Sequence, residues 1–224
     1  MSSIADNLRS VRQRIDEAAQ RSGRSGSDVT LVAVTKTRSP EEILEAVSHG
    51  ATDIGENYVQ EAERKLGRIT GDVRWHMIGH LQRNKAKAAV EMFSVVHSVD
   101  SEALARDLGR RAEAAGRELD VLIEVHISGE QSKHGVEEGE VLPLAEVVSG
   151  IDGVRLCGLM GMPPLAADPE ETRPYFRKLK QTWDRLPKEQ RLYLSMGMTQ
   201  DFEVAIEEGS NMVRIGTAIF GSRG

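Results

Sequence analysis

The chain has 224 residues, of which 39% are hydrophobic and 29% are charged, and its formal net charge at pH 7 is −6. This length can bury a substantial core, and the composition is that of an ordinary globular protein. The acidic balance, with no long basic tract, argues against a nucleic-acid partner, which would require a basic face.

The N-terminal segment is charged and amphipathic. Ile4, Leu8, Val11 and Ile15 recur at helical spacing, so we expect a helix over residues 3–22. The segment lacks the apolar centre of a secretory signal, and no run reaches the roughly 18 apolar residues that a membrane span needs. Cys157 is the single cysteine, which excludes an intramolecular disulfide and makes a cytoplasmic location the natural expectation. We interpret Cys157 as a small buried core residue.

Short apolar runs and helical patterns alternate along the rest of the chain. The runs are residues 30–35, 51–55, 73–79, 93–99, 120–128, 154–160, 191–196 and 211–220. Eight such units in a chain of this length predict an α/β fold, a single closed (β/α)8 TIM barrel with an extra N-terminal helix. An open doubly wound sheet is the alternative, although the glycine-rich turn after its first strand is missing. No linker divides the chain, so we expect one domain over residues 1–224.

Several of the expected helices have recognisable ends. Ser39, Pro40 and Glu42 form a capping box with a proline in the first turn, and Gly50 is placed to end that helix. The other expected N-caps are Asp100 or Ser101, Asp168 and Thr199.

Lys36 is the first candidate functional residue. It lies two residues past the apolar run 31–34, and barrels of this type carry their chemistry at the C-terminal ends of the strands. An arbitrary lysine is usually a surface residue whose stem covers apolar area. The position at a strand end favours an amine that faces a binding site.

Two glycine-containing turns follow the last two strands, where barrels often bind phosphate. They read SMGMTQD (195–201) and RIGTAIFGS (214–222). Each places a hydroxyl beside a glycine, and the first N–H groups of a helix can donate to an anion. Either glycine alone indicates only a tight turn, but the two together predict a phosphate site.

Arg214 lies inside the last strand, and alternation places its side chain on the same face as Gly216. A guanidinium near a barrel interior is costly unless its hydrogen bonds are accepted, either by an acid of the core or by a ligand. Lysine, phosphate site and arginine together favour a phosphorylated carbonyl compound, because an amine can attack an aldehyde to give a Schiff base. The ligand is then pyridoxal phosphate or a sugar phosphate of the aldolase type.

Over nearly its whole length the chain resembles the pyridoxal phosphate homeostasis protein family, whose fold is also that of the N-terminal barrel of bacterial alanine racemase. The matching motifs, in order, are AVTKT (33–37), GENYVQE (55–61), WHMIGHLQRNK (75–85), HSVDS (97–101), SKHGV (132–136), GLMGMPP (158–164), SMGMTQDFEVAIEEGS (195–210) and VRIGTAIFG (213–221). One departure is Thr199, where the family usually has serine, so a hydroxyl is retained.

The resemblance implies that Lys36 forms the internal aldimine with pyridoxal 5'-phosphate and that Arg214 faces the pyridine nitrogen. The remaining implied contacts are Ser195, Gly216 and Thr217 to the phosphate, Met196 and Gly197 in its loop, and Asn57 and His76 along the ring.

The resemblance also implies that the cofactor is held and delivered within intracellular homeostasis, with no established catalysis. An arginine keeps the pyridine nitrogen unprotonated, so carbanions on a bound amino acid are poorly stabilised. Apo-forms of pyridoxal phosphate enzymes are the implied partners, and we expect a monomer because no long apolar helix face is left over.

Two rival functions and one rival site remain. A racemase-like enzyme would need a base, for which the candidates are His76, His126 and Lys133. A Schiff-base aldolase would share the lysine and the phosphate loops, but such lysines usually come from a later strand. We expect no metal, because His76 and His80 would share a face only on a helix and lack a third ligand. The remaining histidines, His49, His97 and His134, are assigned to helix ends or loops.

Overall fold

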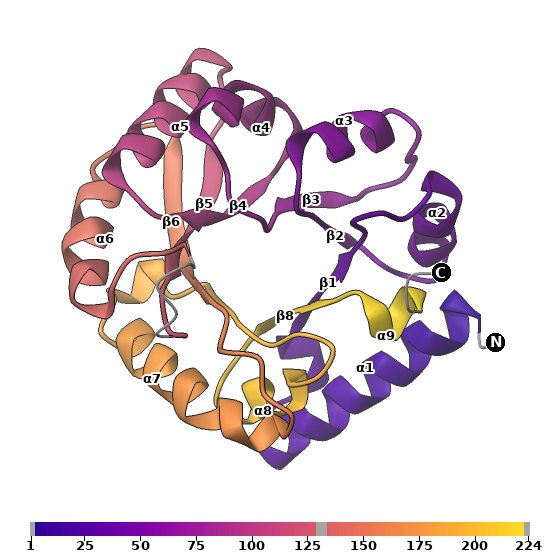
Figure 1. The fold of residues 1–224 in the computed structure, drawn as a ribbon. Helices are drawn as coiled ribbons and strands as arrows, with labels where there is room; N and C mark the ends of the chain where they lie inside the picture. Colours follow the sequence, from indigo (N-terminus) through magenta and orange to yellow (C-terminus); the bar gives the residue numbers. More distant parts are fainter. Residues whose placement is uncertain (1–2, 129–133, 222–224) are drawn as a thin grey trace.

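Eight parallel strands close into a barrel in the order of the sequence, surrounded by helices (Figure 1). The computed structural model describes residues 3–128 and 134–221. The strands are β1 (Thr30–Val34), β2 (Asp53–Glu56), β3 (Arg74–Met77), β4 (Val95–Val99), β5 (Leu119–Val125), β6 (Val154–Gly161), β7 (Tyr193–Ser195) and β8 (Met212–Ile215). Pairing of β1 with β8, with Leu31 opposite Val213, closes the sheet. The predicted (β/α)8 barrel is confirmed.

The helices form the outer layer of the barrel (Figure 1). They are α1 (Ile4–Arg21), α2 (Pro40–Ser48), α3 (Val59–Leu66), α4 (Ala86–Met92), α5 (Glu102–Ala114), α6 (Val141–Ser149), α7 (Arg173–Asp184), α8 (Phe202–Glu207) and α9 (Thr217–Phe220). The extra N-terminal helix is α1, which buries Leu8, Val11 and Ile15 and packs against α8 and α9. None of the helices in the described part of the chain combines the length and the apolar character needed to span a bilayer.

Helix starts follow the local sequence in most places. Ser39 and Glu42 form the predicted capping box of α2. Ser101, rather than Asp100, caps α5 by accepting from the Leu104 N–H. Asp168 caps a short 3-10 turn that precedes α7. These caps satisfy N–H groups that have no partner inside a helix.

Two sequence predictions about the C-terminal part were wrong. Thr199 does not cap α8, which begins three residues later; its hydroxyl instead accepts from the N–H of Ala218, 3.4 Å away. The apolar run 211–220 is not one strand, because β8 ends at Ile215 and the chain turns into α9. A short apolar run cannot by itself distinguish a strand from a buried helix, and here residues of α9 pack on α1.

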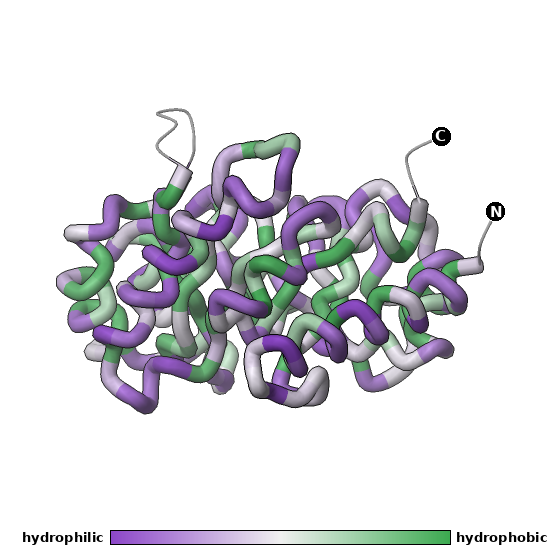
Figure 2. Tube along the Cα trace, turned by 90° about the horizontal axis from the view of Figure 1, so that it is seen from below, coloured by the Kyte–Doolittle hydropathy of each residue, from purple (hydrophilic) through white to green (hydrophobic). Residues whose placement is uncertain are grey.

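The core has an apolar layer between strands and helices and a mixed interior inside the barrel. In side view, apolar stretches run through the middle of the molecule and hydrophilic ones lie mostly at its surface (Figure 2). Part of the barrel interior is apolar and fully buried, with Val95, Leu122, Cys157 and Met160 in one cluster. Cys157 is therefore the buried core residue that the sequence predicts, and burial raises the pKa of its thiol to about 12.

Candidate functional site

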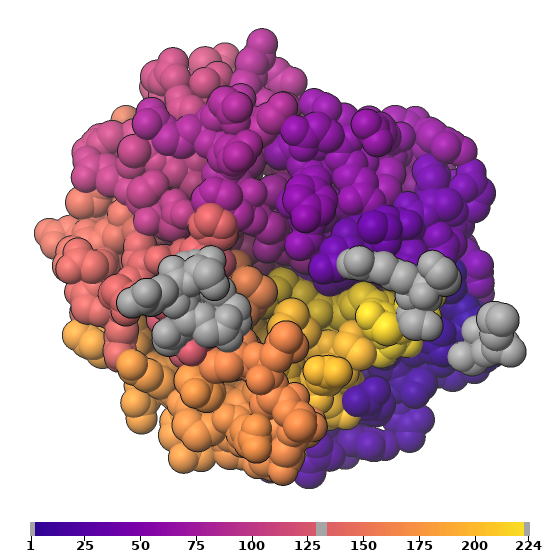
Figure 3. Space-filling model, viewed as in Figure 1, coloured from indigo at the N-terminus to yellow at the C-terminus, as the bar shows by residue number. Residues whose placement is uncertain are grey.

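A cavity of about 490 Å³ opens at the C-terminal ends of the strands, where the molecule is hollowed near its centre (Figure 3). Segments from the first and the last third of the chain meet there. The cavity is lined by Val34, Lys36, Asn57, Ile78, Met162, Pro163, Pro164, Leu165, Ala166, Pro169, Thr172, Met198, Thr199, Gln200, Asp201, Arg214, Gly216 and Thr217.

Lys36 is half-buried in the wall of this cavity. Within the part of the chain that the structure describes, its ammonium group has no hydrogen-bond or ion-pair partner. The backbone on either side of it is held firmly. The Thr35 carbonyl accepts from Lys65 Nζ at 2.7 Å, and the Thr37 N–H donates to the carboxylate of Glu61. The sequence thus presents one free amine on a fixed backbone.

Thr37 shows that this backbone is also constrained. Its φ is +65°, a left-handed conformation that a β-branched residue rarely adopts. Such conformations persist only where surrounding contacts hold them, and they are common at functional sites. The contacts of the turn that follows β1 therefore hold a strained backbone next to Lys36.

Arg214 lies on the inner face of β8, only 4% exposed, and reaches the same cavity. Its Nη1 donates to the carbonyl and the hydroxyl of Ser195, at 2.9 and 2.6 Å, and its Nη2 donates to the Gly161 carbonyl at 3.4 Å. Burial lowers its pKa to about 10, so the guanidinium remains charged at neutral pH. These three bonds leave two of its five N–H donors for a further acceptor.

An ion pair between Arg214 and a core acid was one of two interpretations of the sequence. Among the described residues, no carboxylate lies within 4 Å of the guanidinium. Glu124 and Asp201 act on it only at longer range. A buried cation without a close counter-ion is expensive, so the geometry favours the other interpretation, in which a ligand supplies the acceptor.

The turns after β7 and β8 meet at one side of the cavity. The Thr199 hydroxyl accepts from the Ala218 N–H and so joins the two turns. Gly216 precedes α9 and lies against β1, where an added Cβ would be 3.3 Å from the Val34 carbonyl oxygen. The Ile219 N–H donates to the Gly216 carbonyl, so of the first N–H groups of α9 that of Thr217 has no acceptor among the described residues. The structure therefore brings together the two turns in which the sequence predicts a phosphate site.

Four of the predicted contact residues do not line the cavity. Ser195 and Met196 are fully buried at the end of β7, and Gly197 is buried with φ +96°. The Gly197 carbonyl accepts from the Arg214 N–H at 3.0 Å, so this segment holds Arg214 in place. His76, expected at the ring, lies inside β3 and is fully buried in the barrel interior.

His76 belongs to a chain of buried polar groups that runs through the barrel. Its Nε2 lies 2.9 Å from Asp53 Oδ1, and its Nδ1 lies 2.9 Å from His97 Nε2. His97 Nδ1 in turn lies 3.1 Å from the Ser195 hydroxyl, which contacts Arg214. Burial lowers the pKa of both histidines. We call these groups the polar column; it positions Ser195 and, through it, Arg214.

His97 corrects the sequence analysis, which assigned it to a helix end or loop. It lies within β4, with no exposed surface. The signal was available, because His97 sits inside the apolar run 93–99, where a polar residue in a barrel strand must face either the interior or the helices.

The segment after β6 also lines the cavity, and its role was not predicted. Residues 162–166, with Pro169 and Thr172, form much of one wall, and Leu165 is 87% exposed at the rim. The motif GLMGMPP marks the segment in the sequence, but a loop without periodicity does not reveal which side of the barrel it covers.

Neither of the two proton-transfer candidates in the described part of the chain, His76 and His126, lines this cavity. His76 is inside the barrel, and His126 lies beside a smaller cavity, where its Nδ1 contacts Glu137 at 2.9 Å. Lys133 lies outside the described residues. The carboxyl group that does line the cavity is Asp201; burial raises its pKa, and its Oδ1 already accepts from the Met198 N–H at 2.7 Å.

Residues 4–224 match the family described as alanine racemase, N-terminal domain. Curated relatives cover almost the whole chain. A protein named pyridoxal phosphate homeostasis protein from Aquifex aeolicus is 42% identical over 97% of both chains. Its namesake from Escherichia coli K12 is 40% identical over 100% of this chain and 98% of its own.

Solved structures give the same fold. PipY of Synechococcus elongatus, in a structure with pyridoxal phosphate bound, is 34% identical, with a TM-score of 0.85 over 98% of this chain and 100% of its own. Alanine racemase from Bartonella henselae has a TM-score of 0.73 but is 13% identical and is covered over 58% of its length. The second likeness concerns the fold alone.

Proposed function

Because the chain belongs to the pyridoxal phosphate homeostasis protein family, we propose that it binds pyridoxal 5'-phosphate in the cavity at its strand ends and takes part in the intracellular supply of this cofactor. One observation carries the proposal. A free amine, from Lys36, and a buried guanidinium without a close counter-ion, from Arg214, line one cavity together with the turn of Gly216 and Thr217.

The residues present fit the group. Arg214 has N–H donors to spare and needs an acceptor, and Asn57 Oδ1 is buried without a partner among the described residues. The turns after β7 and β8 offer the hydroxyls of Thr199 and Thr217 and the Thr217 N–H to a phosphate. When bound, pyridoxal phosphate supplies an aldehyde that a primary amine can attack.

Lys36 would provide that amine and hold the cofactor covalently. It is the lysine that lines the cavity, and the contacts of Thr35 and Thr37 fix its backbone. Apolar Val34 and Ile78 nearby reduce the access of water to the amine. Ser195, Met196 and Gly197 would act indirectly, by shaping the turn after β7 and by holding Arg214.

We further propose that the bound cofactor is not used for catalysis. Arg214 stays charged at neutral pH and can only donate hydrogen bonds, so it cannot give the ring nitrogen the proton that a strong electron sink requires. The three tyrosines, Tyr58, Tyr175 and Tyr193, do not line the cavity. A racemase-like activity is the second candidate, and Asp201 is the group in the cavity that could serve it as a base.

The same proposal includes the setting of this role. The free, buried Cys157 is consistent with a reducing cytoplasm. A monomer is proposed because, within the described residues, the exposed large apolar side chains are only Tyr58, Leu165 and Leu192. Apo-forms of pyridoxal phosphate enzymes are the proposed recipients.

The decisive experiment compares wild type with Lys36→Ala after incubation with pyridoxal phosphate. We expect the wild type to become yellow and to keep one cofactor per chain after borohydride reduction, as seen by mass spectrometry. Lys36→Ala should lose covalent loading entirely, whereas Lys87→Ala, which removes an exposed lysine of α4, should load fully. If Lys36→Ala retained the bound cofactor after reduction, the anchor would be another lysine, with Lys133 tested next.

Two further assays test the absence of catalysis and the delivery. Loaded protein mixed with an apo-enzyme should restore that enzyme's activity faster than borohydride-reduced protein, which cannot release the cofactor. Incubation with single enantiomers of several amino acids should give no racemisation above the rate of free cofactor. Sustained turnover that is lost in Lys36→Ala would refute the non-catalytic role.

A further inference from the structure

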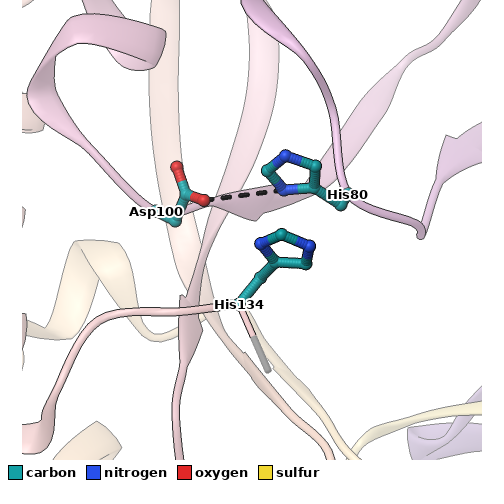
Figure 4. Close-up of side chains that lie close together, drawn as sticks. All are labelled: His80, Asp100 and His134. Carbon is teal, nitrogen blue, oxygen red and sulfur yellow. Dashed lines mark ion pairs between the residues drawn. The ribbon is translucent and has the colours of Figure 1, made fainter. Parts of the chain in front are cut away.

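Three side chains from consecutive strand ends converge at the mouth of the barrel, and none of them lines the cavity that contains Lys36. They are His80 after β3, Asp100 directly after β4, and His134 beyond β5, all labelled in Figure 4. One potential ligand atom from each lies within 4.8 Å of the others. His80 Nδ1 is 3.6 Å from Asp100 Oδ2, and the rings of His80 and His134 stack with their centroids 3.6 Å apart.

The chemistry of this set is that of a transition-metal site. Two imidazoles and one carboxylate suit divalent first-row metals such as Zn²⁺, and three protein ligands leave a position for water. Metal–ligand bonds of about 2.1 Å place tetrahedral donors about 3.4 Å apart. The separation of His80 from Asp100 is close to this already. His134 is exposed, so its ring can turn out of the stack toward the same point.

Asp100 is oriented by a second contact. Its Oδ1 accepts from the hydroxyl of Ser101 at 3.2 Å, while its Oδ2 faces His80. Ser101 is itself fixed, because it caps α5. Ligating carboxylates are typically held in this way by a neighbour outside the coordination shell.

An independent observation lies directly beside the three residues. A small cavity of about 10 Å³, enough for one water, is lined by His134, Glu124 and His126. Glu124 is 5% exposed, and its Oε2 has no hydrogen-bond partner among the described residues. His126 Nε2 is also buried without a hydrogen-bond partner among the described residues. A buried polar atom without a protein partner requires a ligand, an ion or a water as its partner.

We propose that His80, Asp100 and His134 bind a divalent first-row transition metal, with Glu124 available to a metal-bound water. The site is distinct from the proposed cofactor cavity, although Met162 lines both cavities. His80 was considered as a metal ligand only together with His76, but His76 is buried in the barrel and His80 has two other partners. A bound metal would tie together the loops after β3, β4 and β5.

The test uses the full chain without an affinity tag and without cofactor, titrated with Co²⁺ and with Zn²⁺. We expect one equivalent of Co²⁺ to give visible d–d absorption, Zn²⁺ to displace it, and Zn²⁺ to raise the Tm, because a ligand of the folded state stabilises it. Asp100→Asn and His134→Gln should each weaken Zn²⁺ binding by more than about 10-fold, since even disturbed outer contacts cost that much.

Matched variants separate this site from other sources of binding. His49→Gln, at an exposed helix end, should bind Zn²⁺ as the wild type does. Lys36→Ala should also bind it normally, so that failure of the cofactor proposal would leave this result intact. Circular dichroism checks that each variant is folded. The proposal is overturned if no stoichiometric Co²⁺ spectrum develops, or if the Asp100→Asn/His134→Gln double variant keeps wild-type affinity.

Discussion

Two lysines contact or continue the turn after β1, and their surroundings are opposite in kind: Lys36 lies in this turn, and Lys65 reaches it from α3. Lys65 is 5% exposed, and its ammonium group meets three acceptors, the Thr35 carbonyl and the carboxylates of Glu56 and Glu61, at 2.7, 2.7 and 2.8 Å. Lys36, one residue after Thr35, has none among the described residues. The same turn therefore carries a free cation, Lys36, and accepts a hydrogen bond from a fully paired one, Lys65.

The difference indicates which charges build the fold and which remain for a ligand. The three bonds of Lys65 fix the turn from which Lys36 projects, and the polar column fixes Arg214 in the same manner from below. Of the groups without partners in the described part of the chain, Lys36, Asn57 Oδ1 and Glu124 Oε2 lie beside cavities, whereas others, such as Glu56 Oε2 and Ser98 Oγ, line neither cavity. Buried polar groups are normally paired, so these exceptions require an explanation.

The largest effect that tests this division is expected at Lys65. Lys65→Met leaves the fully buried Glu56 without its counter-ion, and breaking a buried pair in this way should lower the free energy of unfolding by about 3–5 kcal/mol. Lys36→Met, the matched control, should change it by less than about 0.5 kcal/mol. Urea denaturation at pH 7 measures both. If both variants lost a similar free energy of unfolding, Lys36 would also be a structural cation and the distinction between the two lysines would be wrong.

A smaller, pH-dependent effect is expected at Asp53 in the polar column. Burial alone would raise the pKa of Asp53, but its hydrogen bonds with His76, Thr52 and Arg74 outweigh this and lower the pKa from 3.8 to about 2. A lowered pKa means stability that is complete above pH 4 and is lost as the pH falls toward 2. The shift corresponds to about 2 kcal/mol.

Asp53→Asn should therefore be about 2 kcal/mol less stable than wild type at pH 7, and the difference should shrink steadily below pH 4. Urea midpoints measured from pH 7 down to pH 3 provide the check. A constant difference over that range would mean that the loss comes from packing and not from the paired charge.

The sequence predicted those site residues whose positions follow from chain order alone. Lys36 and Gly216 were predicted because they follow strands, and in a parallel barrel all strands end on the same side. Asn57 was implied only by the family resemblance, and it lies at the same cavity. The barrel itself was predictable because apolar strand segments alternate with capped helices along the chain, and this alternation can be recognised from the local sequence. The binding roles of these residues stay predictions until the loading experiment is done.

The parts that could not be predicted depend on register and on loop course. His76 and His97 meet because β3 and β4 pair with His76 beside Val95, which no local pattern encodes. Likewise, His134 stacks on His80, and Val136 pairs beside Val125 at the end of β5, which no local pattern encodes. Helical i, i+4 spacing pairs His80 with His76 and therefore could not predict that His80 contacts His134.

The smallest predicted effect is a gain in stability at high pH. It concerns Glu124, a buried acid with an unpaired oxygen. Burial, followed by the charge of Asp100, raises the pKa of Glu124 from 4.5 to about 7. A carboxyl whose pKa is raised in the folded state costs stability as the pH rises from about 4.5 through 7, here about 3 kcal/mol in all.

Glu124→Gln mimics the protonated acid at every pH but leaves a buried amide poorly paired, which offsets about 1–3 kcal/mol of the gain. The variant should thus be about 1 kcal/mol more stable than wild type at pH 8 in metal-free buffer. Near pH 5, where the wild-type acid is protonated and mainly the cost of the amide remains, it should be about 1 kcal/mol less stable. Thermal or urea unfolding at the two pH values measures it. If Glu124→Gln were as destabilising as Lys65→Met, Glu124 would belong with the paired charges that build the fold, and its free oxygen would not indicate a binding site.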